Sequence, residues 1–157
     1  MKTRFPSGIK QAISDEIDEI FEIEQKCFPG KIGYSKQLLK NLILDKNSNC
    51  LVETNNGIIR AFLIVTYCKN SLIGSIETID VDPIFQNKGI GLKLIKAAEI
   101  DVIQNGMRWL QLEVAETNTA ALELYRKSGY TIKERIKNYY TFDHNGTCNA
   151  FRMIKSL

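Results

Sequence analysis

The stretch VDPIFQNKGIGLKLI, residues 81–95, constrains the fold most strongly, because it joins a strand pattern to a helix pattern through a glycine-rich corner. A run rich in β-branched residues stops at Asp82-Pro83, and helical spacing begins after Gly91. The apolar positions of that helix share one face: Leu94, Ile95, Ala98 and Val102. A strand that leads directly into an amphipathic helix favours a sheet covered by helices.

The other segments extend this pattern along the chain. Helices are predicted at residues 14–27, 35–45, 88–105 and 118–129. Strands are predicted at residues 49–68 (a hairpin turning at Asn55-Asn56-Gly57), 71–81, 107–115, 130–140 and 147–157. We therefore expect a single domain over residues 1–157 of the α/β (α+β) class. Its central mixed sheet should be mostly antiparallel and flanked by about four helices.

Composition excludes several classes of protein. A net charge of +3 without a dense Lys/Arg run gives little reason to expect a nucleic-acid partner. The four cysteines form no CxxC pair, so we expect no metal site and reduced thiols, with Cys27 and Cys68 in the core. The sequence has no secretory h-region and no run of the ~20 apolar residues that cross a bilayer. We expect a cytoplasmic protein with no membrane partner.

The glycine-rich corner itself has two possible interpretations, phosphate binding and tight packing. The first turn of the following helix carries free N–H groups and partial positive charge, which bind phosphate when Gly89 and Gly91 let it approach. Lys88 would add charge. The motif is neither a Walker loop, GxxxxGK(S/T), nor a dinucleotide fingerprint, since Leu94 replaces its third glycine. Alternatively, the glycines only permit tight packing between strand and helix.

Three polar residues follow the corner on the next strand and the next helix. Alternation in WLQLEVA places Glu113 on the face opposite Leu112, and Asn118 then starts a helix whose same face carries Tyr125. A carboxylate near the end of a central strand is costly to bury without a partner or a function. Taken singly, Glu113 fits a salt-bridged strand end and Tyr125 fits a core aromatic. Taken together beside the corner, an acid, a capping Asn and a Tyr form a much rarer combination.

These motifs resemble those of the GNAT superfamily of N-acetyltransferases. DVDPIFQNKGIGLKLI resembles the superfamily's Q/R-x-x-G-x-G/A acyl-coenzyme A loop, and WLQLEVAETNTAALELYRKSGY resembles its following strand and helix. The likeness runs from IEQKCFP to NAFRMIK. With the later Tyr139-Tyr140 pair, the chain looks most like ribosomal-protein-alanine (RimI-type) and archaeal protein N-terminal acetyltransferases.

The resemblance implies a role for each matching residue. The catalytic pair would be Glu113 as general base and Tyr125 as general acid. Acetyl-coenzyme A would be the co-substrate, with no metal, and its contacts would be Ile79, Asp80, Val81, Asn87, Lys88, Gly89, Ile90, Gly91, Leu92 and Asn118. The residues lining the peptide slot would be Phe28, Pro29, Tyr34, Tyr139 and Tyr140. The glycine-rich FPGKIGYS segment departs from the usual pattern of relatives.

The function implied is acetyl transfer to the N-terminal α-amino group of a protein, a ribosomal protein among the expected partners, by direct attack in a ternary complex. One alternative is acetylation of a small amine such as a polyamine or amino sugar, although the expected slot is mainly aromatic rather than acidic. Another is a non-catalytic acyl-coenzyme A-binding module. His144, in DHNG, is expected at an exposed hairpin tip without a catalytic role. The oligomeric state stays open.

Overall fold

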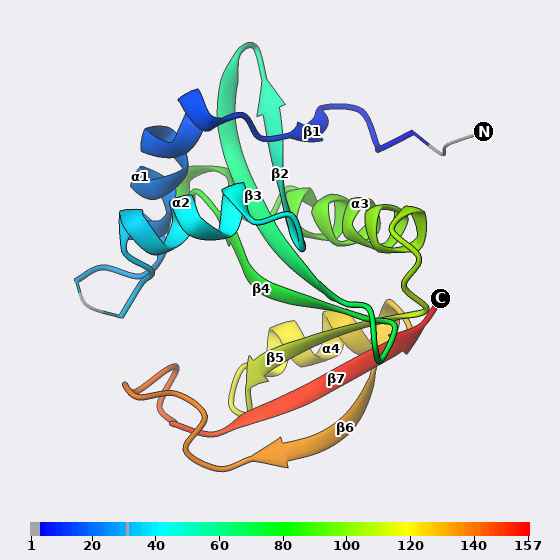
Figure 1. Cartoon of the computed structure of the whole chain (residues 1–157). Helices are drawn as coiled ribbons and strands as arrows, with labels where there is room; N and C mark the ends of the chain where they lie inside the picture. Colours follow the sequence, from blue (N-terminus) through cyan, green and yellow to red (C-terminus); the bar gives the residue numbers. More distant parts are fainter. Residues whose placement is uncertain (1–3, 31) are drawn as a thin grey trace.

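The computed structural model describes residues 4–30 and 32–157, and a seven-stranded sheet runs through its centre in the order β1-β2-β3-β4-β5-β7-β6 (Figure 1). The strands are β1 (Ile9–Gln11), β2 (Ser48–Asn55), β3 (Ile58–Cys68), β4 (Ile73–Val81), β5 (Trp109–Ala115), β6 (Thr131–Ile136) and β7 (Ala150–Ser156). Neighbouring strands are antiparallel except β4 and β5, which run parallel. The predicted mixed, mostly antiparallel sheet is confirmed.

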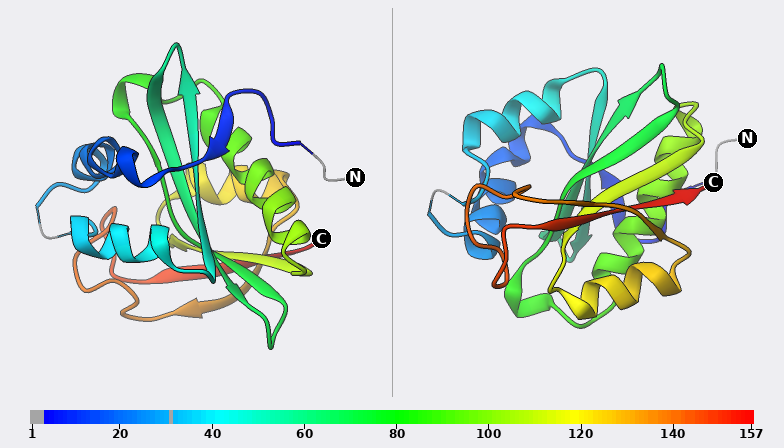
Figure 2. Two further views of the ribbon diagram at one scale, coloured as in Figure 1. Left: turned by 45° about the horizontal axis from the view of Figure 1, so that its top comes forward. Right: turned by 90° about the horizontal axis from the view of Figure 1, so that it is seen from below.

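The four predicted helices are present and cover both faces of the sheet. They are α1 (Ile17–Cys27), α2 (Lys36–Leu44), α3 (Ile90–Gln104) and α4 (Thr119–Lys127). The pair α1 and α2 packs on one face around Phe62, whereas α3 and α4 pack on the other around Leu63. Figure 2 shows the two pairs of helices on opposite sides of the sheet. The result is a three-layer α/β fold.

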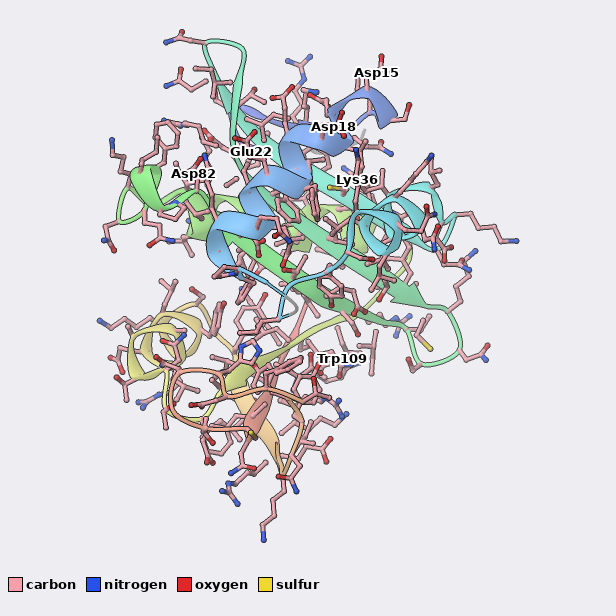
Figure 3. The ribbon with its side chains drawn as sticks, turned by 90° about the vertical axis from the view of Figure 1, so that its left-hand side faces the viewer. Asp15, Asp18, Glu22, Lys36, Asp82 and Trp109 are labelled. Atoms are coloured by element: carbon pink, nitrogen blue, oxygen red, sulfur yellow. The ribbon has the colours of Figure 1, made fainter. Side chains whose placement is uncertain are left out.

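Helix α1 is amphipathic, and this pattern fixes its orientation on the sheet. Ile20 and Ile23 are buried against β2 and β3. Asp18 and Glu22 lie on its exposed face, where Figure 3 also shows Lys36 of α2 beside Asp18. Lys36 forms an ion pair with Asp18 across the two helices. Because both side chains are exposed, this pair contributes little to stability, and the buried isoleucines hold the helix.

The hairpin β2–β3 is closed by the predicted turn. Asn56 and Gly57 have φ angles of 52° and 77°, the left-handed conformation that a two-residue turn between twisted strands requires. Strand β6, in contrast, ends earlier than predicted. It stops at Ile136 because Asn138 takes up a φ of 54°, so Tyr139 and Tyr140 lie in a loop and not in a strand.

The contact between β4 and β5 is short, and this shapes the site. Their parallel pairing covers only Ile73–Ser75 against Trp109–Gln111. Beyond it, β4 follows β3 as far as Val81, whereas β5 follows β7. A bulge in the β3–β4 ladder, where Glu77 has no partner on β3, bends β4 at the point of divergence. Figure 1 shows the two strands fanning apart from their shared end.

Two further expectations concern cysteines and membranes. Cys27 is half-buried, but Cys68 is exposed at the end of β3, so its expected core position was wrong. Cys68 is the last residue of β3, where it pairs with Ile73, and the turn to β4 follows it. Among the described residues, no helix has the length and apolarity needed to cross a membrane.

Candidate functional site

A cleft of about 800 Å³ opens where β4 and β5 part. This volume lies in the range of small-molecule and cofactor sites. Of the residues singled out in the sequence, those that line it are Phe28, Tyr34, Ile79, Glu113, Asn118, Tyr125, Tyr139 and Tyr140. Pro29, Asp80, Val81 and residues 87–92 are not part of its lining. The cleft therefore unites both expected catalytic residues with most of the expected slot.

The part of β4 that borders the cleft has no partner strand on the side of β5, although side chains donate to its Glu77 and Val81 carbonyl groups. The Asp82 N–H donates to the Arg60 carbonyl on β3 at 2.9 Å. Because backbone groups alternate along a strand, the N–H groups of Ile79 and Val81 point the opposite way, toward the opening. Asp80 does not fit its expected role: its backbone faces β3, and its side chain is buried.

The corner before α3 is open to the outside. Gly89 caps the helix with a φ of 80°, and the first intrahelical bond runs from the Lys93 N–H to the Gly89 carbonyl at 3.2 Å. The N–H groups of residues 90–92 precede that bond and are free for a ligand. A Cβ at Gly89 would meet nothing within 4 Å, and one at Gly91 would meet only Val81 Cγ2, at 3.8 Å. Tight packing therefore does not explain why Gly91 is glycine.

Glu113 and Tyr125 lie on β5 and α4 at the wall of the cleft. Glu113 Oε1 accepts a hydrogen bond from Arg152 Nε of β7 at 2.8 Å, so the salt-bridged strand end foreseen for this residue exists. Burial raises the pKa of Tyr125, so its hydroxyl carries a proton at neutral pH. Asn118 Oδ1 accepts from the Ala121 N–H at 3.2 Å, which confirms the predicted helix cap.

A carboxylate that the sequence did not single out holds the loop of residues 137–149. Glu116, directly after β5, accepts from Arg135 Nε at 2.6 Å and from Arg135 Nη2 at 3.2 Å. It also accepts from Thr147 Oγ1 at 3.0 Å and Asn149 Nδ2 at 2.9 Å. Mainly through Arg135, these donors lower the pKa of Glu116 to about 2. The loop is thus pinned to the end of β5 beside the cleft.

This pinned loop places aromatic rings on the cleft wall. The His144 ring stacks on Tyr140 with centroids 4.0 Å apart and lies 5.9 Å from the Phe28 ring. Tyr139 meets Tyr140 edge to face at 5.0 Å. His144 does sit at a hairpin tip, paired with Thr147, but it lines the cleft and is half-buried. The exposed position expected for it was wrong, because the stacking depends on how the loop folds back.

Two buried carboxyl groups adjoin the slot, and one of them, Glu24, is among the residues that line the cleft. Glu24 and Asp80 are each 1% exposed. Glu24 Oε2 accepts from the Tyr34 N–H at 3.3 Å, and Asp80 Oδ1 accepts from Thr78 Oγ1 at 2.8 Å. Within the described residues, the other oxygen of each group has no hydrogen-bond donor. Burial and the neighbouring Glu24 raise the pKa of Asp80 to about 9, so one proton shared by the pair satisfies both oxygens.

The sequence model of the Acetyltransferase (GNAT) family matches residues 17–130, which include β4, the corner, α3, β5 and α4. The chain belongs to the GNAT acetyltransferase family. Ribosomal protein bS18-alanine N-acetyltransferase from Haemophilus ducreyi is 32% identical over 149 residues, covering 95% of this chain and 99% of its own. The family and this relative identify the chain as an N-acetyltransferase.

Solved GNAT structures share the whole fold of this acetyltransferase. The ribosomal-protein-S18-alanine N-acetyltransferase from Escherichia coli superposes with a TM-score of 0.83 at 24% identity, over 94% of this chain and 92% of that one. A GNAT acetyltransferase from Elizabethkingia anophelis, solved with acetyl-CoA bound, gives a TM-score of 0.75 at 19% identity, over 97% and 100% of the two chains. At these identities the likeness supports the fold and no specific substrate.

Proposed function

We propose that this GNAT acetyltransferase transfers an acetyl group from acetyl-coenzyme A to the N-terminal α-amino group of a protein. The observation that carries the proposal is that one cleft is bordered by the open edge of β4 and lined by Glu113 and Tyr125. Because attacking amine, thioester and proton carriers must meet at one point, their convergence matters more than any single residue.

The cofactor part of the proposal rests on the corner and the strand edge. The free N–H groups at the start of α3 suit a pyrophosphate, and Gly91 leaves them accessible. The N–H groups of Ile79 and Val81 suit an extended pantetheine arm, which would lie along β4 as an added strand. The related E. anophelis protein binds acetyl-CoA in the same fold.

The chemistry proposed for the cleft removes two protons from the protonated acceptor amine and supplies one proton to the leaving thiolate. An α-amino group has a pKa of ~8, so at neutral pH a base must take a proton from it, and the carboxylate of Glu113 lines the cleft. The amine attacks the thioester carbonyl, a C–N bond forms, and the Val81 N–H stabilises the oxyanion. As the C–S bond breaks, the departing thiolate takes the proton of Tyr125. The second proton of the nitrogen then passes to the Tyr125 oxygen, directly or through a water, and the proton on Glu113 is released to solvent.

The name of the H. ducreyi relative specifies an alanine of ribosomal protein bS18. This name favours a protein N-terminus as the acceptor for the present chain. The aromatic wall of Phe28, Tyr34 and Tyr140 also suits a peptide. A small cationic amine is the second candidate, because Glu24 and Glu77 also line the cleft. Glu24 is bonded to the Tyr34 N–H, and Glu77 Oε1 accepts from Thr66 Oγ1 at 2.7 Å, so both are already engaged.

The test is an acetylation assay on matched acceptors, read by mass spectrometry. A panel of peptides with free N-termini, including the first residues of ribosomal protein bS18, is compared with the same peptides N-formylated and with spermidine and glucosamine. We expect modification of the free N-termini only. Equal modification of the formylated peptides would show lysine acetylation, and preferred turnover of spermidine or glucosamine would replace the proposal by the second candidate.

A further inference from the structure

Arg152 lies at the centre of a cross-strand triad. On β7 it stands directly opposite Glu113 of β5 and Glu134 of β6 in the sheet register. Its Nε donates to Glu113 Oε1 at 2.8 Å, and its Nη1 donates to Glu134 Oε1 at 2.6 Å. The Glu113 side chain is 12% exposed and that of Arg152 28% exposed, whereas Glu134 is 49% exposed. The guanidinium thus bridges a carboxylate in the cleft and one on the surface.

We propose that Arg152 is a positioning residue for Glu113: it fixes one carboxylate oxygen at the cleft wall, so that the other oxygen faces the acceptor amine and takes its proton. This rests on the proposed function, in which Glu113 is the general base. Among the described residues, no hydrogen-bond donor is bonded to Glu113 Oε2. One oxygen is therefore held, and the other is left for the substrate or a bridging water.

The other titratable groups around Glu113 leave Arg152 as its main electrostatic partner. The Glu113 charge acts on three phenols that line the same cleft: Tyr34, Tyr139 and Tyr140. Burial first, and Glu113 in addition, raise the pKa of all three, so they are uncharged at neutral pH. Glu134 partly offsets the charge of Arg152 from the outer side.

The direct test compares kcat with KM in wild type, Arg152→Met and Arg152→Lys, with the melting temperature and the coenzyme A affinity from calorimetry as controls for folding. Arg152→Met removes the donor that holds Glu113 Oε1, whereas Arg152→Lys keeps a cationic donor at the same register position. We expect kcat to fall by ~10-fold or more in Arg152→Met with both KM values nearly constant, and to recover toward wild type in Arg152→Lys. An unchanged kcat in folded Arg152→Met would overturn the proposal.

The second readout is whether the effect of Arg152 depends on Glu113. Because a positioning residue acts through the group it holds, Arg152→Met should cost little further turnover in a chain that already carries Glu113→Gln. Glu134→Gln, which changes the same triad on its surface side, should keep the wild-type kcat. Equal losses from Arg152→Met with and without Glu113→Gln would also overturn the proposal. If Glu113→Gln alone retains full turnover, the proposed general base fails, and this single variant distinguishes that failure from a failure of Arg152 to act on Glu113.

Discussion

At the scale of single residues, the buried pair Glu24–Asp80 requires a particular protonation state. Two ionised carboxylates with oxygens lacking donors could not remain buried together, since each would carry an uncompensated charge. The pKa of Asp80 is raised to about 9 from an ordinary value of 3.8, so at neutral pH it holds a proton. The Glu24 side chain can then accept from both Asp80 and the Tyr34 N–H, which supports the slot.

This protonation state predicts a pH-dependent stability. Between pH 4 and pH 9 the folded state holds a proton on Asp80 that the unfolded state has released, so the free energy of unfolding falls as pH rises. Asp80→Asn keeps a hydrogen-bond donor toward Glu24 and removes this dependence. In urea unfolding, the free energy of unfolding of Asp80→Asn should increase relative to that of wild type between pH 5 and pH 8. Asp15→Asn, at an exposed aspartate, is the control, and parallel curves for Asp80→Asn and wild type would contradict the prediction.

Tyr125 allows a second prediction at the same scale. Replacement by Phe keeps the ring that packs edge to face on Tyr130, with centroids 6.1 Å apart, and removes only the proposed proton donor. We expect kcat to fall while the dissociation constant of coenzyme A, measured by calorimetry, stays nearly constant. If turnover is unchanged, the thiolate leaves without help from Tyr125, and the residue serves only for packing.

At the scale of secondary-structure elements, a substitution at the start of α3 should affect ligand binding and folding stability in opposite directions. Gly91 lies inside the helix with space around it, so Gly91→Ala should stabilise the free protein by up to ~1 kcal/mol through helix propensity. The same methyl group lies where a pyrophosphate would approach. Gly91→Ala should therefore raise the melting temperature of the free protein and reduce the further rise that acetyl-coenzyme A produces.

A matched pair of variants at the two ends of α3 controls for backbone strain. Gly89 and Gly106 have φ angles of 80° and 85°, and an added Cβ meets nothing within 4 Å at either position. Valine at either site should thus destabilise the fold to a similar extent, but only Gly89→Val should weaken coenzyme A binding. Equal affinity of the two variants in calorimetry would mean that the corner does not hold the cofactor.

The same elements show what the sequence can and cannot predict. The Asn118 cap and the position of Glu113 opposite Leu112 follow from patterns within a few residues, so both were predictable. The partners Arg152 and Asp80 were not, because their contacts with Glu113 and Glu24 depend on pairing between segments distant in the chain. Nothing local to HNGT indicates that His144 would stack on Tyr140.

At the scale of the whole molecule, the site results from a sheet that divides in its middle. Antiparallel ladders hold β1 to β4 on one side and β5 to β7 on the other, and only a short parallel contact joins them. The corner before α3 lies at the far end of β4, and Glu113 lies near the end of β5. Because β4 and β5 are parallel and diverge in the same direction, both features lie at the open end of the sheet.

The measurement that tests this account most directly is the pH–rate profile of Glu113→Gln against wild type, on a peptide with a free N-terminus. Gln keeps the shape but cannot take the proton, so we expect a loss of ~10²–10⁴-fold near neutral pH. The loss should shrink as pH rises, because more of the acceptor amine is already neutral. Since the variant also loses the ion pair with Arg152, a lower melting temperature alone decides nothing. Equal rates per folded molecule across the pH range would contradict the account.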